Sequence, residues 1–171
     1  MQLKQPIYFD MDGVLVNLDK FFIDNYGSTC LELGHDFVKE KLLQHAPNHF
    51  FQHLTPLHDF EDMKELMVTL KKKGHPVHIL SSCTSYAVNH KIRDDKILWL
   101  KKHGIEENSE ICDTHIIVPG SFMKAHYAPG ILIDDWHEAG LPFKEAGGIW
   151  IEHVNHCDTV DQLVMLNVLW G

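Results

Sequence analysis

The chain has 171 residues, of which 44% are hydrophobic and 23% charged, and its net charge is −9 with histidines neutral. This balance predicts one soluble globular domain and excludes a disordered chain. The acidic charge disfavours binding to a nucleic-acid polymer, which needs clustered lysine and arginine. The first residues lack the apolar stretch of a signal peptide, and no apolar run is long enough to span a bilayer, so we expect no membrane partner.

The four cysteines lie far apart and form no Cys-x-x-Cys pair. This spacing indicates neither a zinc site nor a disulfide framework. We therefore expect reduced thiols and a cytoplasmic protein. His153, His156 and Cys157 resemble part of a metal site, but a fourth ligand and a matching pair are missing.

Five short apolar runs alternate with helical patterns along the chain. This alternation predicts an α/β fold with a doubly wound parallel sheet. An irregular stretch rich in aromatic residues, 18–56, interrupts the alternation, and we interpret it as a small helical cap inserted after the first strand. The catalytic core then comprises residues 1–17 and 57–171. In chain order, the predicted strands are Ile7–Asp10, Pro76–Leu80, His115–Val118, Gly130–Ile133 and Ile149–Ile151.

Between these strands, apolar residues recur at spacings of three and four, which is typical of helices. After the piece at 18–26, a helix follows the capping residue Asp59 and ends at Gly74. A short helix is expected near 138–146, and the last helix is expected to be capped by Asp158 or Thr159. The helix before Gly104 is predicted to turn Ile92, Trp99 and Leu100 inward and to carry Lys96 on its surface or in an ion pair with Asp94 or Glu107.

Paired carboxylates follow two of the predicted strands. Asp10 and Asp12 come after the first strand, with Gly13 ending it, and Asp134 and Asp135 come directly after the fourth. The carboxyl ends of parallel strands meet at one edge of a sheet, where such folds place their active sites. Close carboxylates repel one another, and a hard cation such as Mg²⁺ is their natural partner.

Hydroxyl and ammonium groups are expected at the same edge. Ser81 and Ser82 end the second strand, and Lys124 lies in the loop before the fourth. Serine and lysine can hold the oxygens of a phosphate, and a carboxylate beside a metal can attack phosphorus. For Ser82, a helix-capping role is equally compatible with the sequence.

In these motifs and their order, the chain resembles the haloacid dehalogenase superfamily of aspartate-nucleophile phosphatases. The four motifs of that superfamily match Ile7–Val14, Val77–Ser81, Lys124 and Ile131–Asp135. The resemblance implies that Asp10 is the nucleophile and that Asp12 is the general acid and base. It also implies that Ser81, Ser82 and Lys124 bind the substrate phosphate, and that Mg²⁺ binds Asp10, the backbone carbonyl of Asp12, and Asp134 or Asp135.

Within that superfamily, the chain is most similar to the 5'(3')-deoxyribonucleotidase family, which implies a nucleoside monophosphate as substrate. Leu18 departs from the phenylalanine usual there, and Phe122-Met123 replaces the common Arg-Asp. These departures keep open another small metabolite, such as a phosphosugar, as the substrate. A non-catalytic regulatory protein of the same fold is a separate alternative, and we expect a monomer or a homodimer. The similar stretches are Asp10–Leu15, Phe50-Phe51 with Leu54 and Pro56, Ser81-Ser82, Lys96 with Trp99, and Leu132–Asp135.

Aromatic residues of the predicted cap offer a stacking surface for a base or, alternatively, form the small core of the cap itself. We expect at least four of the six to belong to that core, because small helical units need aromatic residues to pack. The six are Phe21, Phe22, Tyr26, Phe37, Phe50 and Phe51.

Overall fold

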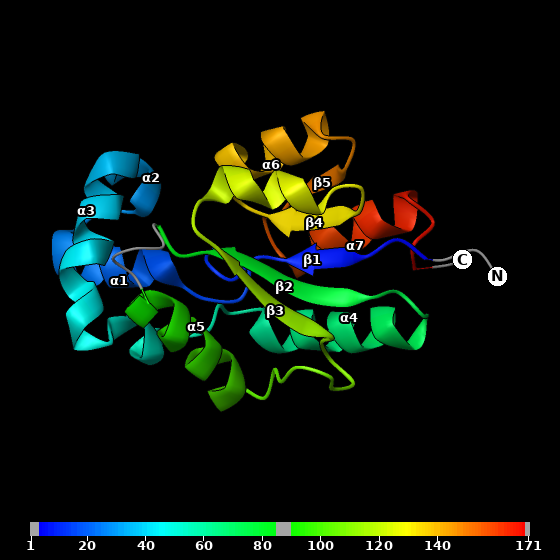
Figure 1. The fold of residues 1–171 in the computed structure, drawn as a ribbon, viewed down its shortest axis with the longest axis horizontal. Helices are drawn as coiled ribbons and strands as arrows, with labels where there is room; N and C mark the ends of the chain where they lie inside the picture. The colour runs from blue at the N-terminus through cyan, green and yellow to red at the C-terminus, as the bar shows by residue number, and fades with distance from the viewer. Residues whose placement is uncertain (1–3, 85–89, 170–171) are drawn as a thin grey trace.

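A computed structural model describes residues 4–84 and 90–169 of the chain. Its centre is a five-stranded sheet with the order β3-β2-β1-β4-β5, and every neighbouring pair is parallel. Helices cover both faces of the sheet (Figure 1). The predicted doubly wound α/β fold is thereby confirmed. The strands are β1 (Ile7–Phe9), β2 (Val77–Ser82), β3 (Thr114–Val118), β4 (Ile131–Asp134) and β5 (Ile149–Glu152).

The helices fall between the strands, with the largest group between β1 and β2. The α-helices are α1 (Leu18–Tyr26), α2 (Cys30–Leu33), α3 (His35–His45), α4 (Phe60–Lys72), α5 (His90–Lys102), α6 (His137–Glu145) and α7 (His156–Met165). The 3₁₀ helices are η1 (Ala46–Asn48), η2 (Phe50–His53) and η3 (Ser121–Tyr127).

Successive side chains of each strand point to opposite faces of the sheet, and helices bury both faces. Ile7 and Phe9 of β1 join the larger core, which includes residues of α4, α5 and α7. Tyr8 points to the other face and packs with Phe143 of α6 and Met123 of η3. The three residues of β1 pair with β2 on one side and β4 on the other, so the residues after β1 come to lie between the ends of two other strands.

Helices α1, α2 and α3 lie together at one end of the molecule, at the left in Figure 1. The chain enters and leaves this helical segment side by side. Val16 bridges to Pro56, the backbone N–H of Asn17 donates to Thr55 at 2.9 Å, and that of Leu57 donates to Leu15 at 2.9 Å. This arrangement fixes the segment next to the end of β1 at both of its connections.

The aromatic residues of the helical segment pack mainly on one another, as expected. The ring of Phe21 lies 5.4 Å from that of Phe22 and 4.9 Å from that of Phe50. Tyr26 contacts both Phe22 and Phe37. These contacts form an aromatic cluster within the segment, and this cluster is continuous with the larger core of the sheet.

The predicted cap of the last helix is wrong. Helix α7 begins after Asn155, whose side chain accepts a hydrogen bond from the backbone N–H of Asp158 at 3.0 Å. A carboxylate also contributes here, because Asp59 Oδ2 accepts a hydrogen bond from the backbone N–H of His156 at 2.7 Å. Asp59 does stand at the start of α4, but its side chain makes no capping hydrogen bond there. It serves the neighbouring helix instead, a contact that no local pattern reveals.

No helix in the described part of the chain has both the length and the apolar character required to cross a membrane.

Candidate active site

Asp10 follows β1 directly and is only 5% exposed. The chain then reverses in a tight turn, in which the carbonyl oxygen of Met11 accepts from the backbone N–H groups of Leu15 and Val16, both at 2.8 Å. Gly13 makes the turn possible with a φ of 76°, a conformation that other residues rarely adopt. The turn brings Asp12 back to the same edge of the sheet as Asp10.

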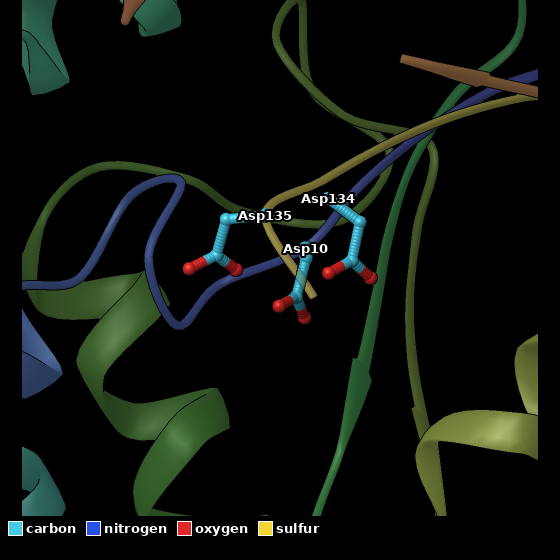
Figure 2. Close-up of side chains that lie close together, drawn as sticks. All are labelled: Asp10, Asp134 and Asp135. Atoms are coloured by element: carbon cyan, nitrogen blue, oxygen red, sulfur yellow. The ribbon is translucent and has the colours of Figure 1, made fainter. Parts of the chain in front are cut away.

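Three carboxylates converge at this edge. One oxygen each of Asp10, Asp134 and Asp135 lies within 4.8 Å of the other two. Figure 2 shows the three side chains, which come from the segments that follow β1 and end β4, close to one another. Asp134 is held in place because its Oδ1 accepts from the backbone N–H of Trp136 at 2.9 Å. Neighbouring strand ends thus bring together residues more than 120 positions apart in the sequence.

Lys124 supplies a positive charge between two of these carboxylates. Its Nζ lies 2.8 Å from Asp10 Oδ1 and 2.6 Å from Asp134 Oδ2. The side chain is buried, at 2% exposure. Burial alone would lower the pKa of Lys124, but the adjacent carboxylates of Asp10 and Asp134 outweigh it and raise the pKa. The residue lies in the 3₁₀ helix η3, where a loop was predicted.

One ammonium does not balance three carboxylates, and the pKa values reflect the deficit. Burial raises the pKa of Asp134 to about 7; Lys124 opposes this rise, and repulsion from Asp10 adds to it. Loss of hydration beside the surrounding atoms, then repulsion from Asp134, Asp10 and Asp12, raises the pKa of Asp135 to about 8. The Asp135 side chain is nevertheless exposed to water, which screens such repulsion, whereas Asp134 is fully buried.

The chemistry of this group fits a hard divalent cation. All its donors are carboxylate oxygens, the ligands that Mg²⁺ prefers in proteins, and a second positive charge would balance the uncompensated carboxylates. Within the described residues, this is the one cluster of three or more possible metal ligands. His153, by contrast, is buried and shares a hydrogen bond of 2.8 Å with Thr159 Oγ1.

The side chain of Asp12 lies outside the carboxylate cluster and turns towards helix α5. Its Oδ2 accepts from Lys96 Nζ at 2.6 Å. Burial raises the pKa of Asp12, with a further contribution from repulsion by Asp10, against the opposing effect of Lys96. The carboxyl of Asp12 therefore holds a proton more readily than an ordinary aspartate.

Lys96 was expected on a helix surface or paired with Asp94 or Glu107, and this prediction is wrong. The residue is 1% exposed and lies in the site. Besides Asp12, its Nζ donates to Ser81 Oγ at 2.9 Å and to the backbone carbonyl of Ser82 at 2.8 Å. The sequence contained a signal, because Lys96 shares the inward helical face of Ile92 and Trp99 at spacings of four and three.

The two serines lie at the end of β2, beside the carboxylates. Ser81 is fully buried, and its hydroxyl binds Lys96. Ser82 lines a small hollow next to Asp12, with polar and apolar residues in its lining. The described residues that line this hollow are Asp12, Leu42, Phe51, Ser82, Cys83, Thr84, Ile92 and Lys96.

The helical segment of α1, α2 and α3 also comes close to the carboxylates. Cys30, at the start of α2, is close enough to the carboxylates that burial, then a hydrogen bond to Asp19, then the charges of Asp12 and Asp135 raise its pKa. Polar and ring contacts also join the segment to the rest of the protein. The ring of His35 lies 6.2 Å from that of Trp136, and His49 Nδ1 lies 2.9 Å from Asp95 Oδ1.

Comparison with known proteins identifies a shared fold. No family model and no curated protein sequence matches the chain. Among solved structures, a hydrolase from Streptococcus pneumoniae TIGR4 is similar, with a TM-score of 0.52 and 15% sequence identity, over 97% of this chain and 100% of that one. At this identity, the similarity concerns the architecture of the whole chain.

Proposed function

We propose that this protein is a Mg²⁺-dependent phosphomonoester hydrolase of the haloacid dehalogenase superfamily. The observation that carries the proposal is the cluster of Asp10, Asp134 and Asp135 with Lys124 between two of them. Asp12 lies two residues beyond Asp10 and outside the cluster, as a separate acid and base requires. The likeness in fold to a protein described as a hydrolase is in keeping with this proposal.

Asp10 is the proposed nucleophile. A carboxylate oxygen of Asp10 forms a bond to phosphorus while the bond from phosphorus to the ester oxygen breaks, which leaves an aspartyl-phosphate. Its burial at the end of β1 and its contact with Lys124 hold it in one orientation. A nucleophile that is already held in position reacts faster, because little translational and rotational entropy remains to be lost on reaching the transition state.

Asp12 is the proposed general acid and base. In the first step, it gives its proton to the leaving ester oxygen. In the second, the oxygen of a water molecule bonds to phosphorus while the bond from phosphorus to Asp10 breaks, and Asp12 accepts a proton from that water. Phosphate is released and the carboxylate of Asp10 is restored. Its raised pKa suits the first of these steps, because the proton must still be bound when the substrate arrives.

The remaining polar groups are proposed to hold the phosphate. Lysine has three N–H donors, and Lys124 uses two of them on Asp10 and Asp134, which leaves one for a phosphate oxygen. Ser81 and Ser82 stand at the end of β2, next to Lys96. Donors placed where charge gathers on the phosphoryl oxygens stabilise the transition state.

Asp10, Asp134 and Asp135, with the backbone carbonyl of Asp12, are the residues that would hold Mg²⁺. When bound, the ion offsets the repulsion between an anionic nucleophile and an anionic substrate. Residues 18–56 are proposed to act as the cap, which excludes water and selects the leaving group.

The narrower proposal is a 5'(3')-deoxyribonucleotidase, which rests on the sequence motifs alone. All six aromatic residues of the cap pack on one another. Of the six, Phe51 also lines the hollow beside Asp12, so it is the one placed to meet a leaving group. A phosphatase for another small metabolite uses the same chemistry and differs only in this selection.

The test is phosphate release from deoxy- and ribonucleoside 5'- and 3'-monophosphates and from sugar phosphates, with Mg²⁺ and with EDTA. Mg²⁺-dependent release that is fastest with deoxynucleotides supports the nucleotidase proposal. Release from sugar phosphates alone retains the mechanism and rejects the nucleotide. Folded protein that binds Mg²⁺ and releases no phosphate from any of them contradicts the proposed activity.

Asp10→Asn provides the matched mutational test. The variant keeps the shape of the side chain but removes the attacking carboxylate, so we expect turnover to disappear while the protein stays folded. Asp161→Asn, at an exposed position of α7, makes the same chemical change outside the carboxylate cluster and the cap and should retain wild-type turnover. Substantial activity in Asp10→Asn would contradict the proposed mechanism.

A further inference from the structure

Lys96 is a buried charged residue of the site to which the proposed chemistry gives no task. It is held by three acceptors, namely Asp12 Oδ2 at 2.6 Å, Ser81 Oγ at 2.9 Å and the carbonyl oxygen of Ser82 at 2.8 Å. An ammonium group has three N–H donors, so these partners use all of them. Lys96 therefore has no donor left for a phosphate, unlike Lys124.

The contacts of Asp12 are correspondingly unequal. Its Oδ2 is bound to Lys96, whereas its Oδ1 is buried and has no hydrogen-bond partner among the described residues. The ring of Phe51 lies 4.8 Å from Lys96 Nζ and shields the ion pair from water on that side. One carboxyl oxygen of Asp12 is thus anchored, and the other is a buried oxygen without a hydrogen-bond partner among the described residues, in a residue that lines the hollow.

We infer that Lys96 is a positioning residue that orients Asp12 towards the ester oxygen of the substrate. Through its contacts with Ser81 and Ser82, it links the carboxyl of Asp12 to the end of β2, so the proton donor and the proposed phosphate-binding serines keep a constant spacing. The inference rests on the proposed phosphatase activity and extends it to a residue outside the four superfamily motifs.

The inference makes a specific prediction about leaving groups. A phenolate leaves readily without protonation, whereas an alkoxide needs a proton from the general acid. Loss of the acid's orientation must therefore slow alkyl esters far more than activated aryl esters. A lysine that merely bound phosphate or merely stabilised the fold would affect both esters alike.

The experiment compares Lys96→Met with wild-type protein on two substrates of similar shape, p-nitrophenyl phosphate and p-nitrobenzyl phosphate. General acid catalysis contributes about 10²–10⁴-fold. The comparison uses kcat/KM, which reports the step that expels the ester oxygen and not the later attack of water on the aspartyl-phosphate. We expect kcat/KM for the benzyl ester to fall by about 100-fold or more and that for the phenyl ester by less than about 10-fold. Equal losses on both esters would overturn the inference.

Lys71→Met is the matched control. Lys71 Nζ likewise binds one carboxylate and one backbone carbonyl, those of Asp113 and Ser109, both at 2.8 Å, but it lies at the other end of the sheet. This variant should leave the ratio of the two rates unchanged.

A double-mutant cycle tests whether Lys96 acts through Asp12. In an Asp12→Asn background, Lys96→Met should change the benzyl ester rate by less than about 3-fold, because coupled residues do not have additive effects. A further loss of 100-fold would overturn the inference.

A crystal structure of Lys96→Met provides a readout without turnover. The Asp12 carboxyl should leave its position in wild-type protein, and an unmoved carboxyl would contradict the inference. Wild-type protein that is inactive on every phosphomonoester would instead reject the proposed function and, with it, this role of Lys96. Active wild-type protein with equal losses in Lys96→Met rejects the role of Lys96 alone.

Discussion

The carboxylate of Asp135 occupies the space that a side chain at position 13 would fill. A Cβ atom at Gly13 would lie 1.9 Å from Asp135 Oδ2 and 2.3 Å from its Cγ. Gly13 also has a φ of 76°, so the turn after β1 needs glycine both for its conformation and for the approach of this carboxylate. The absence of a side chain at Gly13 therefore allows Asp135 to pack against the turn after β1.

Gly13→Ala should displace Asp135 and break the carboxylate cluster. We expect Mg²⁺ affinity and phosphatase activity to fall by at least about 100-fold, because a carboxylate forced aside loses its contribution to the charge of the site. Alanine at positive φ should add about 1–2 kcal/mol of destabilisation. Calorimetric Mg²⁺ titration and phosphate release measure the two effects.

Gly27→Ala is the control for Gly13→Ala. Gly27 has a similar φ of 79°, but a Cβ atom there would meet nothing within 4 Å. The variant should therefore show the backbone strain without the loss of Mg²⁺ affinity. Equal affinity losses in the two variants would show that the contact with Asp135 is not responsible.

The stabilising effect of Mg²⁺ should increase with pH. Because the pKa of Asp134 is raised to about 7 in the folded protein and is about 4 in an unfolded chain, the folded state binds more protons between these values. Without metal, the stability that Asp134 contributes is fully present below about pH 4 and is lost as the pH rises through about 7. Mg²⁺ competes with the same proton, so the gain in Tm on adding Mg²⁺ should be larger at pH 8 than at pH 5.5.

Thermal melts with EDTA and with excess MgCl₂ across this range measure that gain. Asp134→Asn cannot titrate at this position and should show a much smaller gain that varies little with pH. A gain in wild-type Tm that is equal at both pH values, or larger at pH 5.5, would contradict the assigned charge state.

Lys124→Met should destabilise the metal-free protein. The variant leaves Asp10 and Asp134 without their shared cation, and removing one member of a buried ion pair costs about 3–5 kcal/mol. The deficit should be largest above pH 7, where Asp134 ionises, and Mg²⁺ should recover part of it. Urea denaturation with EDTA and with Mg²⁺ checks both statements, and a loss below about 1 kcal/mol with EDTA at pH 8 would refute the first.

Trp99→Phe should weaken the attachment of α5 to the end of the helical segment. The indole Nε1 of Trp99 donates to the carbonyl oxygen of Leu54 at 2.8 Å, and Trp99 is fully buried. Phenylalanine leaves that carbonyl unsatisfied, at a cost of about 1–3 kcal/mol. Urea unfolding should show the loss with an unchanged m-value, and a change within about 0.5 kcal/mol would mean that the bond contributes little.

Much of the sheet could be predicted because its strands are short apolar runs that end in polar residues. Ile7–Phe9 and Ile131–Asp134 are buried on both faces, so nearly every side chain in them is apolar. Parallel order then requires Asp10, Asp134 and Asp135 to meet at one edge. No contact between elements had to be known to reach this prediction.

Other parts could not be predicted because they depend on which elements pack together. Lysine is a residue type that usually lies on the surface, and only the packing of α5 against the end of β2 buries Lys96 beside Ser81. In the same way, Asp59 caps the neighbouring helix α7 through His156, a residue 97 positions further along the chain. In both cases the partner is remote in sequence, and local pattern carries no record of it.

By itself, the sequence determined the α/β architecture and the gathering of Asp10, Asp134 and Asp135, since apolar periodicity and strand ends are local properties of a chain. Only the tertiary structure decided which ammonium serves which carboxylate. Lys124 pairs with Asp10 and Asp134, and Lys96 pairs with Asp12 across 84 positions. Charge pairing acts over a few ångströms in space, and those distances exist only once the helices have packed on the sheet.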